Sequence, residues 1–363
     1  MDLLFRIFAF FAGLAIVVLT VYSAIETFVL PRAAQDLLTR AVFLAVRRCL
    51  NLGMRFAHTY EGRDRIMAFF APVALLALVP TWLILVSAGY VLMYWAFGVN
   101  TLWDDIRLSG SSMLTLGFAT AETLPQMILV FSEATIGLIL VALLIAYLPT
   151  MYAAFSKREA AVTLLEVRAG SPPSAVEMIA RYHSIHGLGA LSEQWRAWET
   201  WFAEVKESHT SLPPLVFFRS PQPYHSWVTA AGAVLDTASL TLAAVDIPND
   251  PQAALCIRSG YLTLRAIADF YQIRYNPDPH FPSDPISIAR AEFDRACAQL
   301  ETAGVPLKAD RDQAWQNFAG WRVNYDPVLL ALARLTMAPP APWSSDRVEG
   351  VYMPPIVLLK RRK

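Results

Sequence analysis

Long apolar stretches without charge alternate with charged segments over the first half of the chain. Residues Ile7 to Ile25, Ile66 to Trp103 and Ala134 to Ser156 contain no Asp, Glu, Lys or Arg. A helix needs roughly 20 residues to cross the hydrocarbon core of a bilayer, so each stretch is long enough to span it. The pattern predicts three transmembrane helices within the first 156 residues.

Two of these stretches allow a second interpretation. Arg6 precedes the first apolar run and Tyr22 to Ala24 resembles a signal-peptide cleavage site, but the run exceeds the roughly 7 to 15 apolar residues of a signal core. We therefore expect a retained helix. The second stretch is longer than one span needs and contains Pro72 and Pro80. One tilted helix over Val73 to Phe97 is expected, with a two-helix hairpin as the alternative.

Positive charge is concentrated on one side of the predicted spans. The short loop between the second and third spans has only Arg107, and Lys157 and Arg158 follow the third span. The segment after the first span holds seven arginines: Arg32, Arg40, Arg47, Arg48, Arg55, Arg63 and Arg65. Because cytoplasmic loops carry an excess of Lys and Arg, we expect a multi-pass protein of the cell inner membrane. Its N-terminus would lie outside and its C-terminal domain in the cytoplasm.

The arginine-rich segment has apolar residues at roughly helical spacing between Ala33 and His58. This predicts an amphipathic helix on the inner leaflet, where its arginines could bind anionic membrane lipid. A plain connector that obeys the charge rule remains the alternative.

A polar break with the sequence SGSSMLTLGFATAE covers Ser109 to Glu122, between the second and third spans. Non-helical backbone at membrane depth must be buried in protein or line a water-filled path. A short helix over Thr101 to Leu114 would direct its negative end toward the membrane centre. In the extended stretch after it, inward-facing carbonyl groups need alternating left- and right-handed residues, which Gly117 suits and Ala119 does not.

The stretch Thr115-Leu116-Gly117-Phe118 resembles the core of potassium-channel selectivity filters. Ala119 replaces the second glycine of that pattern, and Thr120 replaces the usual aspartate. The resemblance extends over residues 73–155 and is to the pore module of two-span bacterial potassium channels. It implies a potassium-conducting pore with Thr115, Leu116, Gly117, Phe118 and Ala119 as its filter. One loop per chain further implies a homotetramer. An ordinary extracellular loop, a nonselective cation pathway and a pore without conduction remain alternatives.

Thr120 and Glu122 are expected at the outer mouth of this pore, where acidic side chains concentrate cations. Three further acidic residues are expected nearby: Asp104, Asp105 and Glu133. In the third span, Gly137 and Pro149 are candidates for a hinge and a kink. Close helix packing at Gly137 and a helix end at Pro149 are the alternatives. The spans, as delimited, contain no charge, which argues against a proton-coupled transporter.

The region 157–336 reads as a mainly helical cytoplasmic domain, large enough for its own core. Helix-length patterns recur between proline-rich breaks, at 158–168, 175–183, 192–205, 226–244, 253–272, 286–303 and 310–319. The tail 337–363 is rich in proline and ends in Lys360 to Lys363. We expect it to be flexible or close to the membrane.

No chemical site emerges in this domain. His183 and His186 could share a metal, but no third ligand is evident. Gly187 and Gly189 follow no recognisable strand, so no dinucleotide site is indicated. An aromatic stripe of Trp195, Trp198, Trp201 and Phe202 is typical of a core. Three scattered cysteines suit a reducing compartment: Cys49, Cys256 and Cys297. We expect no metal, no cofactor and no enzymatic activity, and a regulatory ligand stays undefined.

The composition agrees with a membrane protein that carries a soluble part. Hydrophobic residues make up 55% of the 363-residue chain and charged residues 17%, with a mean hydropathy of +0.40. The net charge is zero, so nothing indicates a nucleic-acid partner. The predicted fold is all-α: a first transmembrane helix (1–30), a basic amphipathic segment (31–65), a pore module (66–156) with a re-entrant loop, the helical domain and the tail. The expected function is a cation channel conducting potassium; the alternative is a non-conducting, membrane-anchored helical adaptor or sensor.

Overall fold

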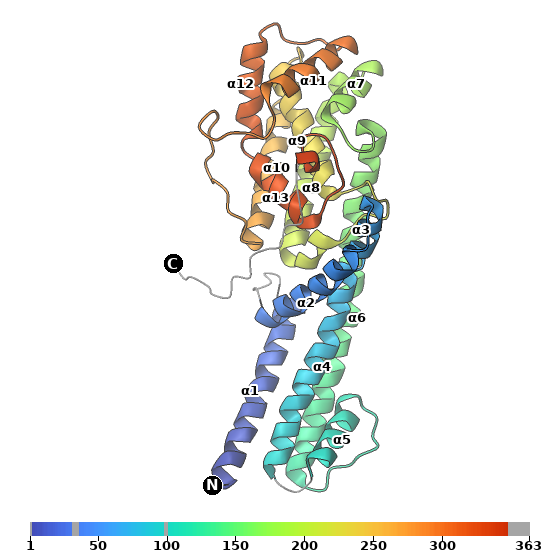
Figure 1. The fold of residues 1–363 in the computed structure, drawn as a ribbon, viewed down its shortest axis with the longest axis vertical. Coiled ribbons are helices and arrows are strands. Elements are labelled where there is room, and N and C mark those ends of the chain that lie inside the picture. Colours follow the sequence, from blue (N-terminus) through green and yellow to red (C-terminus); the bar gives the residue numbers. More distant parts are fainter. Residues whose placement is uncertain (1, 31–35, 98–100, 348–363) are drawn as a thin grey trace. The chain divides into compact units, whose positions relative to one another are not determined.

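The computed structural model describes residues 2–30, 36–97 and 101–347, and this part of the chain is helical, with one isolated bridge between Val245 and Leu307. It divides into two compact units (Figure 1). The N-terminal unit comprises the chain up to Ala57, Ile66–Ala153 and Ser211–Pro214. The C-terminal unit comprises His58–Arg65, Ala154–Thr210 and the chain from Leu215 onward.

Long apolar helices build the N-terminal unit: α1 (Asp2–Phe28), α4 (Phe70–Phe97) and the first part of α6 (Leu124–Ala169), with α2 (Leu37–Met54) and α5 (Leu102–Met113) between them. Four helices in the described residues are long and apolar enough to cross a membrane. Three of them begin in this unit or run through it, which is compatible with a multi-pass membrane protein. The single helix expected over Val73 to Phe97 is present as α4, with Pro80 inside it.

Small residues let α1 and α4 approach closely. A Cβ at Gly13 would stand 2.4 Å from the carbonyl oxygen of Gly89, and a Cβ at Gly89 would stand 2.7 Å from that of Gly13. Such small-residue contacts are a common basis of helix association in membranes. Nearer the other end of α1, the indole Nε1 of Trp82 donates to the hydroxyl of Ser23 at 3.1 Å.

The amphipathic helix expected near residues 33–58 is present as α2. Asp36 caps it by accepting a hydrogen bond from the amide of Thr39 at 2.8 Å. Arg47 is buried on the inner face of α2, with its guanidinium 5.7 Å from the ring centroid of Phe70. Arg47 is therefore committed to packing within the protein and is not one of the arginines open to lipid.

Helix α6 is longer than the sequence suggested. The third span and the separate helix expected at 158–168 are one continuous helix of 46 residues, Leu124–Ala169. Pro149 lies inside it and does not end it. Since proline has no N–H, the carbonyl four residues earlier loses its helical hydrogen bond there.

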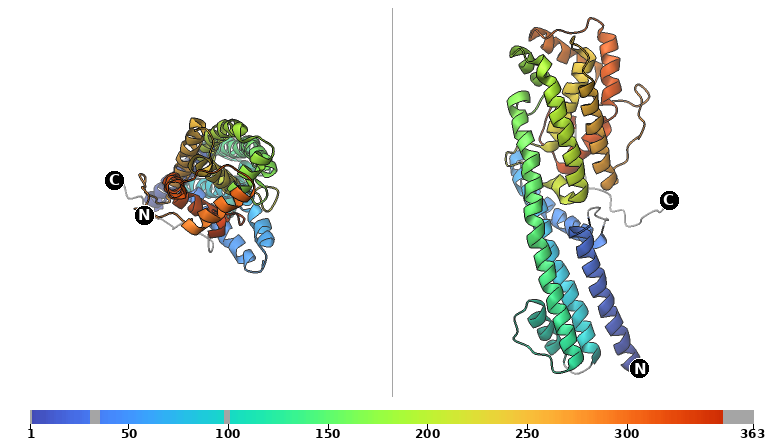
Figure 2. Two further views of the ribbon diagram at one scale, coloured as in Figure 1. Left: turned by 90° about the horizontal axis from the view of Figure 1, so that it is seen from above. Right: turned by 180° about the vertical axis from the view of Figure 1, so that it is seen from behind.

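The C-terminal unit contains α3 (Tyr60–Ala68, up to Arg65), α7 (Ala175–Ser184), α8 (Leu191–Ser211), α9 (Trp227–Ala244), α10 (Pro251–Phe270), α11 (Arg290–Thr302), α12 (Arg311–Arg322) and α13 (Asp326–Thr336). Helices α8 and α10 run side by side in the right-hand view of Figure 2. The hydroxyl of Thr263 joins them by donating to the carbonyl of Phe202 at 2.9 Å. The aromatic stripe on α8 lies in the core, as expected.

Helix α9 is long and apolar enough to be a fourth span, but 94% of its 18 residues are already buried inside the protein. Its burial is supplied by protein and not by lipid, so we treat it as the core helix of this unit. By contrast, only 17% of an apolar 18-residue stretch of α6 is buried, and 22% of such a stretch of α1. A helix that is apolar on all sides has the same sequence pattern in a membrane and in a protein core.

The end of the chain adds a helix that was not predicted, α13. The tail was expected to be flexible or close to the membrane, but its residues from Met337 to Arg347 pack on the C-terminal unit. The Trp343 ring lies 5.5 Å from that of Phe318, and the Trp343 carbonyl accepts a hydrogen bond from the buried guanidinium of Arg322. The basic end, Lys360 to Lys363, lies outside the described residues.

Candidate pore loop and its supporting cluster

Helix α5 presents the proposed filter. It begins after Thr101, whose hydroxyl accepts from the amide of Asp104, and ends at Met113, close to the expected limits of 101–114. Immediately beyond it, Thr115 has φ +54° and Gly117 has φ +73°. Leu116 lies between them and does not have positive φ. The backbone thus alternates in handedness over three residues.

Ser111 of α5 holds this loop through two groups, its backbone carbonyl and its hydroxyl. Its carbonyl accepts from the amide of Leu116 at 2.8 Å, and its hydroxyl accepts from the amide of Ala119 at 3.0 Å. The residues just before α6 are held by Gln126, whose side-chain oxygen accepts hydrogen bonds from the amides of Glu122 and Thr123 at 3.2 and 3.3 Å. Ser111 and Gln126 are both buried, and neither was predicted from the sequence as a site residue.

The candidate filter side chains lie on the surface of the single chain. Thr115, Leu116, Gly117 and Phe118 are exposed, with Leu116 at 62% and Phe118 at 57%, and Ala119 is half-buried. The two outer-mouth candidates, Thr120 and Glu122, are also exposed. The candidate residues thus form one contiguous exposed segment, and the side chains that hold this segment belong to α5 and α6.

Gly137 is a point of close contact between α5 and α6. A Cβ at this position would stand 2.4 Å from the carbonyl oxygen of Met113, the last residue of α5. About two turns earlier on α6, the carbonyl of Val130 accepts a hydrogen bond from the hydroxyl of Ser112 at 2.8 Å. Helix α6 runs without interruption through Gly137. Gly137 therefore permits close packing of α6 against α5, and a hinge at Gly137 stays a prediction.

A fully buried carboxyl group joins three helices behind the loop. Glu133 of α6 accepts from the hydroxyl of Tyr94 of α4 at 2.7 Å and from that of Ser109 of α5. Ser109 also bonds the hydroxyl of Ser87 of α4. No described basic side chain forms an ion pair with Glu133. An ionisable side chain inside an apolar helix is rare and marks a functional position by default.

The structure corrects the expected acidic mouth. Glu133 and Asp105 are both fully buried, so neither faces the solvent of an outer vestibule. Glu133 was also placed just outside the third span, whereas α6 begins nine residues before it. The signal that could have found it is the serine-rich face of α5, because buried hydroxyls at Ser109 and Ser112 need partners on neighbouring helices.

We expect Glu133→Leu to lower the thermal unfolding midpoint by several degrees and to reduce any cation flux. The substitution leaves the buried hydroxyls of Tyr94 and Ser109 without this acceptor, at about 1 to 3 kcal/mol for each unsatisfied group. Glu133→Gln keeps an acceptor oxygen and should lie between Glu133→Leu and the unmodified protein. The exposed Glu122→Gln is the control, and it should leave the midpoint unchanged. A Glu133→Leu protein as stable as the Glu122→Gln protein would show that the cluster does not hold α5.

The other candidates from the sequence form no site. The described residues contain no group of three His, Cys, Asp or Glu side chains that could hold a metal. His183 and His186 therefore have no third ligand beside them among these residues. Cys256 and Cys297 are buried free thiols and Cys49 is an exposed one. Burial raises the pKa of the Cys256 thiol, which makes it a poor nucleophile.

In the C-terminal unit, the segment Leu215 to Ser220 lies around a buried guanidinium. Arg158 donates to the carbonyls of Leu215 and Phe218 at 2.8 and 2.7 Å, and its Nη1 lies 3.1 Å from Nε2 of His209. Burial, with the positive charge of Arg158, holds the pKa of His209 well below its ordinary range. His209 is therefore uncharged at neutral pH.

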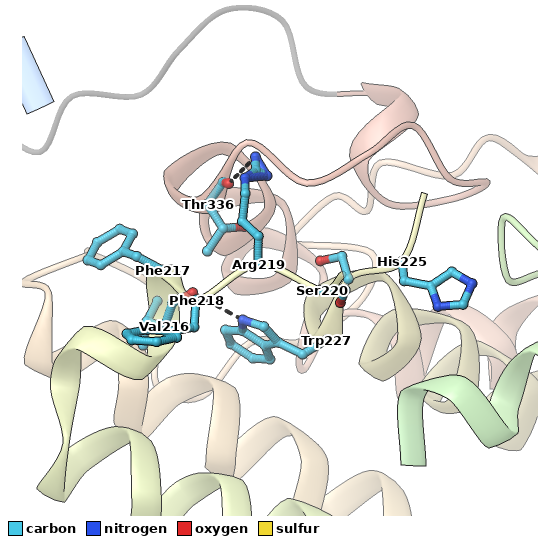
Figure 3. A pocket seen from close by; sticks show the side chains of 9 residues that line it. Val216, Phe217, Phe218, Arg219, Ser220, His225, Trp227 and Thr336 are labelled. Carbon is cyan, nitrogen blue, oxygen red and sulfur yellow. Dashed lines mark hydrogen bonds between the residues drawn. The ribbon is translucent and has the colours of Figure 1, made fainter. Parts of the chain in front are cut away.

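The hollow beside this segment is too small for an organic ligand. Figure 3 shows Trp227 donating to the carbonyl of Val216, and Arg219 donating to that of Thr336. The cavity between them has a volume of about 20 Å³. That is enough for one water molecule.

Comparisons of the chain with known protein families, with curated proteins and with solved structures give no match.

Proposed function

We propose that the chain is one subunit of a homotetrameric cation channel, with potassium as the ion and residues Thr115 to Ala119 as the filter. The alternation of handedness at Thr115, Leu116 and Gly117, in an exposed loop between two long apolar helices, carries this proposal. Successive carbonyl groups can face one axis only when the backbone alternates in this way. A ring of such carbonyls replaces the hydration shell of a cation.

The depth of the loop supports a re-entrant arrangement. The last residue of α5 meets Gly137, thirteen residues into α6, which corresponds to about 20 Å along the helix. Ser109 meets Ser87, ten residues before the end of α4, or about 15 Å along it. The hydrocarbon core is about 30 Å thick. The filter thus begins near the middle of a bilayer that α4 and α6 cross.

Neighbouring copies of the chain would cover the exposed loop. Polar backbone at this depth cannot face lipid, because each unpaired group costs several kcal/mol in hydrocarbon. A carbonyl filter needs several strands around one axis, and each chain supplies one, which is the basis for four copies. Ala119 does not have positive φ, so the alternation ends at Gly117. A filter shorter than that of the potassium-channel family follows, with weaker discrimination between potassium and sodium.

The orientation in the membrane is part of the same proposal. The arginine-rich segment before α4 and the basic residues after Ala153 would lie in the cytoplasm, and the filter would open to the outside of the inner membrane. Anionic lipid would contact Arg48, an exposed arginine of α2. The C-terminal unit would then be cytoplasmic and available to regulate the pore.

Cation flux through purified protein in liposomes tests the proposal. Potassium, sodium and the large cation N-methyl-D-glucamine are compared, with protein-free liposomes as the control, and the mass of the detergent-solubilised assembly is measured in parallel. We expect potassium flux above sodium flux, no flux of the large cation, and a mass of four chains. A monomeric mass and no flux at any voltage would overturn the channel and favour the membrane-anchored adaptor.

A further inference from the structure

A polar cavity in the C-terminal unit opens onto a buried group of charged side chains. It has a volume of about 250 Å³ and is lined by residues of α7, α9, α11 and the segment after α13, among them Ser174, Asp236, Arg295, Gln299 and Trp343. Drug-sized pockets measure roughly 300 to 1,000 Å³, so this cavity would hold a smaller molecule. It lies within one compact unit and is independent of the proposed pore.

The charge group beneath the cavity has one negative charge in excess. Arg322 is fully buried and pairs with two carboxylates, Asp236 and Asp326. Asp326 is further satisfied by the amide and hydroxyl of Ser287, at 2.9 and 2.7 Å. One guanidinium between two buried carboxylates leaves a net charge of −1, which is costly in a low-dielectric interior unless a cation approaches it.

One carboxylate of this group, that of Asp236, lines the cavity. Within the described residues, Asp236 uses its Oδ1 atom for its hydrogen bonds, which come from Arg322 and from Tyr325 at 2.8 Å. No described hydrogen bond ends on its Oδ2 atom, and the residue, 1% exposed, lines the cavity. A hydrogen-bond donor of a ligand in the cavity can therefore pair with this carboxylate.

Arg295 supplies the opposite charge on the wall. It lines the same cavity, is exposed, and forms no described hydrogen bond or ion pair, although its charge acts on the carboxylate of the neighbouring Glu292. The neighbouring Glu292 is already paired, since it accepts from Arg347 at 2.7 Å and from the amide of Ala289 at 2.9 Å. A free guanidinium binds a carboxylate or a phosphate through two parallel hydrogen bonds.

We propose that this cavity binds a small zwitterion of the amino-acid type, with its ammonium group at Asp236 and its carboxylate at Arg295. The ammonium group neutralises the excess charge and donates to Oδ2. The ring of Trp343 and the amide of Gln299 then border the rest of the molecule. The occupant would be a regulatory ligand of the C-terminal unit, whether or not the N-terminal unit conducts ions.

Thermal unfolding of the full-length protein in detergent tests the site. The probes are glycine and L-serine, with ethylammonium and propionate as molecules that each carry one of the two charges. At about a hundred times the dissociation constant, a zwitterion should raise the midpoint by about 5 °C, and each single-charge molecule should raise it far less. Equal shifts with ethylammonium and with the zwitterion would overturn the proposal in favour of a simple cation site.

Substitutions of Arg295 and Asp236 test which side chain binds each charge of the zwitterion. Arg295→Gln is an exposed change that should keep the fold and weaken binding of the zwitterion at least tenfold. Asp236→Asn should abolish the shift. Arg258→Gln, an exposed arginine of α10 away from the cavity, is the matched control and should bind normally. No shift with any probe, or a shift unaffected by Arg295→Gln, would refute the site without bearing on the channel, because conduction is not measured.

Discussion

Replacing Gly117 by alanine is expected to reduce cation flux at least tenfold while the chain still folds. At φ +73° an L-residue is strained, and the left-handed conformation costs about 1 to 2 kcal/mol for a residue with a Cβ. Nothing lies within 4 Å of the position where the Cβ would stand, so the effect comes from the backbone and not from a clash. In the proposed tetramer the strain recurs four times around one axis. Relaxation of the backbone would then turn the carbonyls away from the ion path.

Helix α5, which precedes the loop, offers a matched control. Gly110 also has nothing within 4 Å of an added Cβ, but it lies inside helix α5. Alanine is favoured over glycine in a helix by about 1 kcal/mol, so Gly110→Ala should conduct normally or be slightly more stable. Both variants are compared by potassium flux from liposomes at equal protein content. Normal flux in Gly117→Ala, or an equal loss in both variants, would remove the main support for the filter.

Arg322→Met is expected to destabilise the C-terminal unit by about 3 to 5 kcal/mol, among the largest effects of any single substitution. The guanidinium is fully buried and holds the carboxylates of Asp236 and Asp326 and the carbonyl of Trp343. Without it, two buried carboxylates face each other with no cation. The thermal midpoint in detergent should fall by about 10 °C or more.

The control for this substitution is Arg290→Met. Arg290 also pairs with two carboxylates, those of Asp294 and Asp312, but its side chain is 37% exposed. Surface pairs of this kind contribute about 1 kcal/mol or less, so the midpoint should change little. A triple variant that also replaces Asp236 and Asp326 by asparagine should regain part of the lost stability, because it removes the unpaired charge. Equal midpoints for Arg322→Met and Arg290→Met would show that burial does not strengthen the group.

Helix positions were largely predictable because their signals are local. An uncharged run, a helical period and a capping side chain are each contained within a few turns, and α4, α5, α7 and α9 lie close to the expected limits. The errors have local causes too. Helix α6 continues past the expected end of the third span, because the polar residues after Ser156 suit a helix leaving a membrane as well as a new one. Helix α13 follows α12 after a break of only three residues, 323–325, and was overlooked.

The candidate site divides in the same way. The loop of Thr115 to Ala119 could be selected from its letters, since glycine, threonine and an aromatic residue in this order between two apolar runs suggest a filter. The supporting residues could not. Glu133 meets Tyr94 and Ser109 across 39 and 24 residues of sequence, and nothing in a linear pattern gives the register of three helices. Its carboxyl group was therefore assigned to solvent, although it lies in the interior.

The sequence by itself determined that this chain is helical and that several helices are long and apolar enough to cross a membrane. It also determined that a glycine-containing break lies between the second and third apolar stretches. Composition and period decide these properties, and both are written along the chain. Only the tertiary structure decided which charges meet: Asp236 and Arg322 are 86 positions apart, yet they share one buried group beneath a cavity. Long-range pairing depends on how helices pack, and packing is a property of the whole fold.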